Sequence, residues 1–200
     1  MRVRTLGAAA AALLALTGLA ACKTNIGQAA VIDGHRVSES DVSHYLTPDA
    51  QPVSEQQQDG TSVQISARSF VVSQLINERL AFAILQAVPA VSNVTPAQID
   101  AQLQSDLAGK TPRAVAETLG LHGYTDAFYQ IVLRVQEISG VLRQQSSAAV
   151  QKALSTVHFP VSVSPRYGSW DGKQLRFTSG VTLPSYLDLQ SGAATQQGAS

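Results

Sequence analysis

The chain has 200 residues, enough for one domain or two small ones, and its 14 basic residues balance its 14 acidic residues. A chain without net charge has only a weak electrostatic field. This gives no reason to expect nucleic acid or an anionic membrane surface as a partner. Only 6% of the residues are aromatic, whereas alanine, glutamine and serine are abundant, and this composition favours helices with polar surfaces.

The N-terminus has the three parts of a secretory signal peptide. Two arginines give it a positive start, residues 6–19 form an apolar stretch without a charge, and small residues lead up to Cys22. The stretch is too short and wrongly flanked for a lasting transmembrane helix. Residues 19–22, LAAC, resemble a lipobox, the sequence at which bacteria attach diacylglycerol to a cysteine thiol before cleavage. We predict that residues 1–21 are removed as a signal peptide.

Cys22, the only cysteine of the chain, then becomes the lipid-bearing first residue. Lipidation accounts for an otherwise unpaired thiol in an exported protein, and leaves no cysteine for a disulfide, a catalytic thiol or a metal site. The alternative is an ordinary signal peptide with an incidental cysteine. Loss of Arg2 and Arg4 leaves the mature chain with two more acidic than basic residues. We expect an extracytoplasmic protein that is anchored to the bacterial cell membrane through Cys22.

The mature chain begins with a lipidated polar tether at residues 22–28 and a hairpin signal. Residues 29–37 have the pattern of two brief strands around a tight turn at Gly34, because glycine accepts a positive φ. Ser38 is a good N-cap for a helix from about Glu39 to Leu46. We expect Glu39 to complement the dipole of that helix in its first turn.

The residue pattern of the next segment predicts a loop followed by a long helix. Residues 47–61 contain two prolines, a run of three glutamines and an Asp-Gly pair, which indicate a surface loop. Residues 63–88 form the first long helix, and Pro89 ends it. Nearly every side chain from Leu80 to Leu85 is apolar, so this half should be buried on several sides.

Two further helices share their start and stop signals. Thr95 and Thr111 each precede a proline at the first helical position, and Gly109 and Gly120 end the two helices. Gln98 completes a capping box in the first of them.

The last helix should start after Thr125, which would cap it, and fade near Leu154. Its apolar residues recur at alternating spacings of three and four and form one buried stripe. The stripe consists of Phe128, Ile131, Val135, Ile138 and Leu142. We interpret it as plain helix packing, with an intermolecular coiled coil as the alternative, because it covers barely two heptads.

Residues 159–163 alternate as a strand does, and turn signals at 165–168 and 170–173 precede a short strand at 174–177. Serine, glycine, glutamine and alanine dominate residues 178–200, where we expect a mostly disordered tail.

The strands at the two ends are too short to form a stable sheet alone. We therefore predict that residues 31–32 pair with residues 161–163, and that three aromatic residues cover the apolar side of this base. These aromatic residues are Tyr167, Trp170 and Phe177. The fold class is mainly α, in one domain over residues 29–177. It has a bundle of about five helices, two of them long, on a small antiparallel strand platform formed by the N- and C-terminal ends of the mature chain.

No catalytic or metal-binding motif stands out. The sequence has no G-x-S-x-G elbow, no H-E-x-x-H, no Gly-rich phosphate loop and no C-x-x-C. The histidines are scattered over four predicted elements, at His35, His44, His122 and His158. His44 can share a helix surface with Asp41, but a site would also need a convergent pocket. Glu78 and Glu137 are interpreted as solvated or ion-paired. We expect no catalytic, cofactor-binding or metal-binding residues and no enzyme activity; the alternative is an enzyme with an unrecognised site.

Five segments, in this order, resemble the SurA N-terminal domain family. Residues 29–42, AAVIDGHRVSESDV, look like its opening strand, turn and helix, and residues 74–80, QLINERL, are similar to its leucine-isoleucine-x-glutamate motif. Residues 94–100, VTPAQID, and 123–128, GYTDAF, resemble the starts of later helices. Residues 161–171, VSVSPRYGSWD, look like its closing strand.

This resemblance implies an extracytoplasmic chaperone of the SurA and PrsA type. Many such proteins carry a parvulin-type prolyl isomerase domain between the last helix and the closing strand. Here Leu154 and Phe159 are nearly adjacent, and a domain of about 100 residues cannot fit between them. The resemblance therefore implies a chaperone core without the isomerase. The Gln-rich loop at 51–60 departs from the family pattern.

The expected function is chaperone-like binding of unfolded or newly secreted polypeptides, and apolar clefts between the helices would provide the binding surface. The alternative is a structural lipoprotein that docks one dedicated partner in the cell envelope. An exposed apolar groove favours many clients, whereas a flat, charged or closed surface favours one partner or none.

Overall fold

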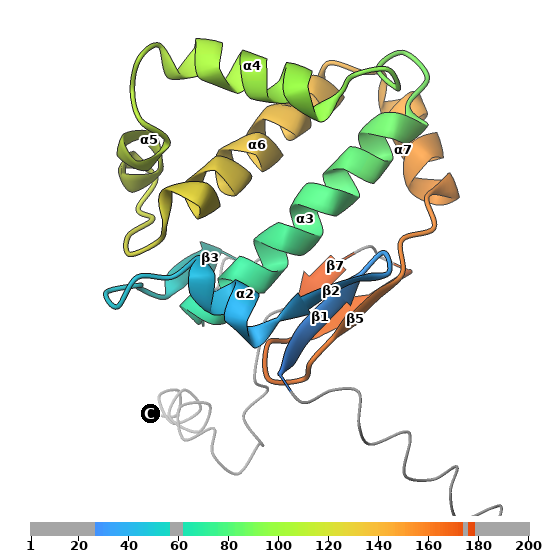
Figure 1. Ribbon diagram of the computed structural model, residues 1–200. Coiled ribbons are helices and arrows are strands. Elements are labelled where there is room, and N and C mark those ends of the chain that lie inside the picture. Colours follow the sequence, from blue (N-terminus) through green and yellow to red (C-terminus); the bar gives the residue numbers. More distant parts are fainter. Residues whose placement is uncertain (1–26, 57–61, 174–175, 179–200) are drawn as a thin grey trace, which may run out of the picture.

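The computed structural model describes residues 27–56, 62–173 and 176–178. Within these ranges the chain is mainly helical, with six helices and small antiparallel sheets, which confirms the predicted fold class (Figure 1). The predicted signal peptide, Cys22 and residues 179–200 of the predicted tail lie outside the described residues.

A three-stranded antiparallel sheet joins the two ends of the described chain (Figure 1). Its strands are β2 (His35–Ser38), β1 (Gln28–Ile32) and β5 (Val161–Val163), in that order across the sheet. Val31 lies opposite Ser162, and Ile32 lies opposite Val161. The predicted pairing of residues about 130 apart is therefore confirmed.

The turn between β1 and β2 has the geometry that its Asp-Gly pair favours. Asp33 and Gly34 have φ values of 49° and 77°, and positive values at both central residues are typical of a type I′ hairpin turn. The Asp33 N–H donates a hydrogen bond to the Pro160 carbonyl at 2.8 Å. The turn thus also holds the chain that leads into β5.

Helix α2 (Glu39–His44) follows β2 directly and starts with the predicted cap. The Asp41 N–H donates to Ser38 Oγ at 3.1 Å, and the Ser38 N–H donates to Asp41 Oδ2 at 2.7 Å. Together these two bonds make a capping box. The cap fixes Glu39 as the first helical residue, beside the sheet.

The predicted loop at 47–61 was wrong in part, because residues 53–56 form a strand that pairs with residues 62–65. β3 (Val53–Gln56) pairs with β4 (Ser62–Ile65). Alternating polar and apolar residues from Ser62 to Ile65 have the period of a strand, and Ile65 is buried. The long helix therefore begins at Ala67 and not at residue 63.

The helical layer stands on this platform (Figure 1). Its members are α3 (Ala67–Ala87), α4 (Pro96–Leu107), α5 (Pro112–Thr118), α6 (Asp126–Arg143) and α7 (Ser147–Thr156). α6 contacts α3, α4 and α5, and α7 packs against α3. The main core runs from Ile32 in the sheet to Ile76 in α3 and Phe128 in α6, all fully buried. Intramolecular packing thus covers most of the apolar stripe of α6.

The last helix starts after Thr125 as predicted, but its end and the capping bond differ from the prediction. The helix does not continue to Leu154 but breaks after Arg143, and α7 begins anew with Ser146 as its cap. Ser146 Oγ accepts the Ala149 N–H at 3.3 Å, and such local capping competes with an uninterrupted helix. Thr125 is the N-cap residue of α6 but makes no side-chain capping bond.

The C-terminal aromatic residues cover the core as predicted. Tyr167 is buried in the main core, and Trp170 and Phe177 pack against it partly buried. Trp170 lies opposite Phe177 where β6 (Ser169–Asp171) pairs with β7 (Arg176–Thr178). This segment is an integral part of the domain.

Candidate functional site

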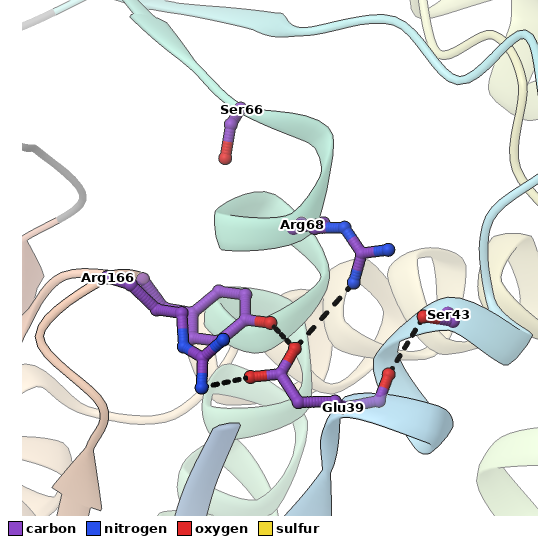
Figure 2. Close-up of a pocket in the computed structure, with 6 residues that line it drawn as sticks. Glu39, Ser43, Ser66, Arg68 and Arg166 are labelled. Carbon is purple, nitrogen blue, oxygen red and sulfur yellow. Dashed lines mark hydrogen bonds and ion pairs between the residues drawn. The ribbon is translucent and has the colours of Figure 1, made fainter. Parts of the chain in front are cut away.

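A hollow of about 450 Å³ lies where the starts of α2 and α3 meet the turn after β5 (Figure 2). The residues that line it are Glu39, Ser43, Ser66, Arg68, Arg166 and Tyr167. Four of the six carry a charge or a phenol, so the hollow is polar. We call this set the Glu39 hollow.

Local signals in three distant segments place these side chains. Glu39 follows the Ser38 cap, and Ser66 is the N-cap of α3, which puts Arg68 in its first turn. Arg166 and Tyr167 belong to the turn that ends β5, where the Tyr167 N–H donates to the Ser164 carbonyl at 2.9 Å. The segments meet because β5 pairs with β1, which leads through β2 into α2.

The carboxylate of Glu39 is the centre of the contacts in the hollow (Figure 2). Its Oε1 lies 3.0 Å from Arg166 Nη2, and its Oε2 lies 3.7 Å from Arg68 Nη1. The Tyr167 hydroxyl donates a hydrogen bond to Oε2. Only 24% of the Glu39 side chain is exposed, against 51% for Arg68 and 56% for Arg166. The anion is thus enclosed while both cations reach solvent.

The hydrogen bonds of Glu39 are incomplete. Its Oε1 is buried yet accepts no hydrogen bond among the described residues, so the contact with Arg166 is an ion pair without hydrogen-bond geometry. Burial and then the hydrogen bond to Glu39 raise the pKa of Tyr167 above its usual value. This phenol therefore keeps its proton near neutral pH and acts as a donor.

The residues weighed as catalytic candidates do not converge on the hollow. All four histidines are exposed, and none lines it. Hydrogen bonds from Ser38, and more weakly the charge of His44, lower the pKa of Asp41, so this carboxylate serves the helix cap. No group of three or more potential metal ligands occurs within residues 27–56, 62–173 and 176–178. The proposed lipid site, Cys22, lies outside these ranges.

Sequence reasoning missed the residues of the hollow as a set. It gave Glu39 only a dipole role and placed Arg166 and Tyr167 in a turn, although 127 positions separate Glu39 from Arg166. The predicted strand pairing was the available signal, because it brings the residue after β2 toward the residues after β5.

A second charged cluster joins the long helices. Arg134 in α6 donates from Nε to Asp100 Oδ1 in α4 at 2.7 Å and from Nη1 to Glu78 in α3. Burial opposes the charge of Arg134, but the two carboxylates outweigh it and raise its pKa. The cluster joins three helices, and Glu78 is ion-paired, which is one of the two predicted alternatives.

Few large apolar side chains are exposed over the described part of the chain. Leu119, at 52%, is the one large hydrophobic residue there that is largely exposed. The polar Glu39 hollow does not fit the expected clefts lined by leucine, isoleucine, valine and phenylalanine. Among the described residues, no helix combines the length and the hydropathy that crossing a membrane requires.

Comparison with known proteins gives no relative: no family model, no curated protein and no solved structure matches this chain. The fold and the hollow define its class, a mainly helical domain closed by strands from both ends, with a charged hollow beside the junction.

Proposed function

We propose that this chain is a lipid-anchored, extracytoplasmic lipoprotein that binds unfolded or newly secreted polypeptides in the manner of a chaperone, without prolyl isomerase activity. The observation that carries the proposal is the closure of the helical domain by β5 on β1. The same order of opening hairpin, helices and closing strand underlies the resemblance to the SurA N-terminal domain.

The connection between α7 and β5 supports the lack of isomerase activity. α7 ends at Thr156 and β5 begins at Val161, at the place where such chaperones carry a parvulin domain. Four residues cannot hold a domain of about 100 residues. Anchoring through Cys22 would keep the domain at the membrane, where secreted chains emerge.

A second candidate is an interaction lipoprotein with one dedicated partner in the cell envelope. The small exposed apolar surface of the described residues favours it, because promiscuous binders use broad, adaptable apolar surfaces. The two candidates differ in the number of unrelated polypeptides that the protein binds.

The direct test of the proposed function is suppression of aggregation. The purified mature chain (residues 22–200), with Cys22→Ser to keep it unlipidated, should reduce light scattering by two unrelated unfolded clients at several-fold excess. It should not accelerate cis–trans exchange in a proline peptide. Unchanged aggregation of both clients would contradict chaperone-like binding. Reduced aggregation of only one client would favour the candidate with one dedicated partner. Robust catalysis of the exchange would overturn the second half of the proposal.

Lipidation has its own test in a bacterial host. The wild-type chain should carry acyl groups on Cys22 and fractionate with membranes, whereas Cys22→Ala should be released or remain an unprocessed precursor. Mass spectrometry of the N-terminal peptide checks the modification. A mature wild-type protein without an acyl group at Cys22 would contradict the anchor. Stable residence requires two acyl chains, because one chain binds a membrane only marginally.

A further inference from the structure

We propose that the Glu39 hollow is a carboxylate-binding site that takes an acidic side chain or the C-terminal carboxylate of a bound polypeptide. The inference deepens the proposed function and rests on it for the source of the carboxylate. The chemistry of the hollow itself rests on the side chains that line it.

The donors of the site are the two guanidinium groups. They flank the Glu39 carboxylate from two sides (Figure 2), and about half of each arginine side chain is exposed, 51% for Arg68 and 56% for Arg166. A guanidinium carries five N–H donors in a planar fork that matches a carboxylate. The contact of Arg68 with Glu39 spans 3.7 Å, longer than a hydrogen bond. Both groups can therefore meet a second anion on the solvent side.

Glu39 lies between the two cations and neutralises only one of their two charges. It is fixed by the Tyr167 hydroxyl and by its position after the Ser38 cap, so it stays at the base of the hollow. Two arginines and one glutamate give the lining a net charge of one positive unit. A single carboxylate balances this charge, whereas a phosphate near its second ionisation would exceed it.

The volume and the walls of the hollow fit one acidic group of a peptide. Its volume of about 450 Å³ lies within the range of ordinary ligand pockets. The first turn of α3 forms one wall, with Ser66 and Arg68, and the partial positive charge of a helix N-terminus adds to the attraction for an anion. The site would fix one acidic group of a longer chain.

The experiment is calorimetric titration of the mature chain (residues 22–200) carrying Cys22→Ser. The probes are acetyl-Ala-Glu-Ala-amide, the matched acetyl-Ala-Gln-Ala-amide, acetyl-Ala-Ala-Ala with a free carboxylate, and inorganic phosphate. The glutamate peptide and the free-carboxylate peptide should bind, and the one that binds more tightly identifies the source of the carboxylate. The glutamine peptide should not bind. Tighter binding of phosphate than of both carboxylates would overturn the assignment.

Three variants and a control identify the site. Arg68→Gln and Arg166→Gln should each weaken glutamate-peptide binding about tenfold, the effect of losing a charge-assisted hydrogen bond. Glu39→Gln should tighten it up to about fivefold, because it removes a like charge. Arg113→Gln should leave the affinity unchanged, because Arg113 is a similarly exposed arginine paired with Asp126 outside the hollow.

Failure of this inference and failure of the proposed function can be told apart. Equal binding of the glutamate and glutamine peptides, or unchanged affinity in both Arg68→Gln and Arg166→Gln, would overturn the carboxylate site even if the protein suppresses client aggregation. Binding of the glutamate peptide with the predicted variant effects would support the site even if no client is protected, and the missing protection would then count against the proposed function alone.

Discussion

At the residue scale, Gly123 has to satisfy two requirements at once. Its φ is +81°, and a Cβ built on it would lie 2.3 Å from Ala50 Cα. The two backbone segments lie this close because they are hydrogen-bonded: the Thr47 N–H donates to the Gly123 carbonyl at 3.0 Å. Gly109 has a similar φ of +84°, but a Cβ there would meet nothing within 4 Å. Comparing alanine substitutions at Gly123 and Gly109 therefore distinguishes backbone strain from steric overlap.

We expect Gly123→Ala to lower the free energy of unfolding by about 3 kcal/mol, as the sum of about 1 kcal/mol for the left-handed backbone and about 2 kcal/mol for overpacking. Gly109→Ala should lower it by about 1 kcal/mol. Urea unfolding followed by circular dichroism measures both. Equal losses would show that the contact with residues 49–50 does not constrain the backbone.

Glu137 gives a prediction of pH dependence at the same scale. Burial, followed by the charge and a hydrogen bond of Asp106, raises the pKa of Glu137 above its usual value of 4.5. The folded state then binds the proton more tightly, so the free energy of unfolding falls as the pH rises from about 4.5 through the raised pKa. Glu137→Gln should stabilise the domain at pH 7 by about 0.5 kcal/mol, after allowance for solvent screening.

The gain from Glu137→Gln should disappear below pH 4, where the wild-type carboxyl is protonated in both states. Thermal unfolding of both proteins at pH 3.5 and pH 7 checks the sign. A gain of the same size at both values would assign the effect to packing, not to ionisation.

At the scale of the elements, the charged cluster of Arg134 holds α6 to α3 and α4. Only 23% of the Arg134 side chain and 17% of the Glu78 side chain are exposed, so removal of the cation leaves a shielded carboxylate without its partner. Breaking a buried pair costs about 3–5 kcal/mol, and partial exposure reduces the figure. We expect Arg134→Gln to lower the free energy of unfolding by about 2 kcal/mol.

The matched control is Arg113→Gln. Arg113 pairs with Asp126 at 2.9 Å, but 49% and 70% of the two side chains are exposed, and such pairs add little to stability. Arg113→Gln should leave the midpoint of urea unfolding unchanged, whereas Arg134→Gln should lower the midpoint. Equal shifts would mean that the cluster does not join the helices.

Element boundaries followed from the sequence wherever a local signal dominates. The N-cap signal at Ser38 and the capping box at Thr95 predicted two helix starts, and both are observed. The hairpin β3–β4 was missed because glutamines and prolines obscured a period-two pattern only four residues long in each strand. The break between α6 and α7 was missed because no proline or glycine marks residues 143–147, and only the capping bond of Ser146 separates the two helices.

At the scale of the whole molecule, the closing strand determines whether the domain is complete. β5 supplies the partner of β1, and Tyr167, which follows it, is 3% exposed. Truncation after Leu154 removes both together with the partly buried Trp170. We expect the fragment to lose cooperative thermal unfolding, whereas a chain that ends at Thr178 should keep it. A fragment ending at Leu154 that melts as cooperatively and as high as the full chain would contradict this role of β5.

The candidate site could be predicted only in part at this scale. The sequence indicated that the two ends of the domain pair, and this pairing sets the position of the hollow. It did not indicate that Glu39 meets Arg68 and Arg166, because side-chain directions at the ends of α2 and α3 depend on packing between elements. The burial of the apolar helix faces could not be predicted either, because it depends on how α4 packs against α6 and α7 against α3.

Chaperone-like binding is measured by equilibrium titration with an unfolded polypeptide. A fluorescently labelled, permanently unfolded polypeptide is titrated with the mature chain (residues 22–200) carrying Cys22→Ser, and its anisotropy is followed. We predict a saturable rise with a Kd of about 1–100 µM, near −8 to −5 kcal/mol, and competition by a second, unrelated unfolded polypeptide. An anisotropy that stays flat up to the highest concentration of the chain would contradict chaperone-like binding.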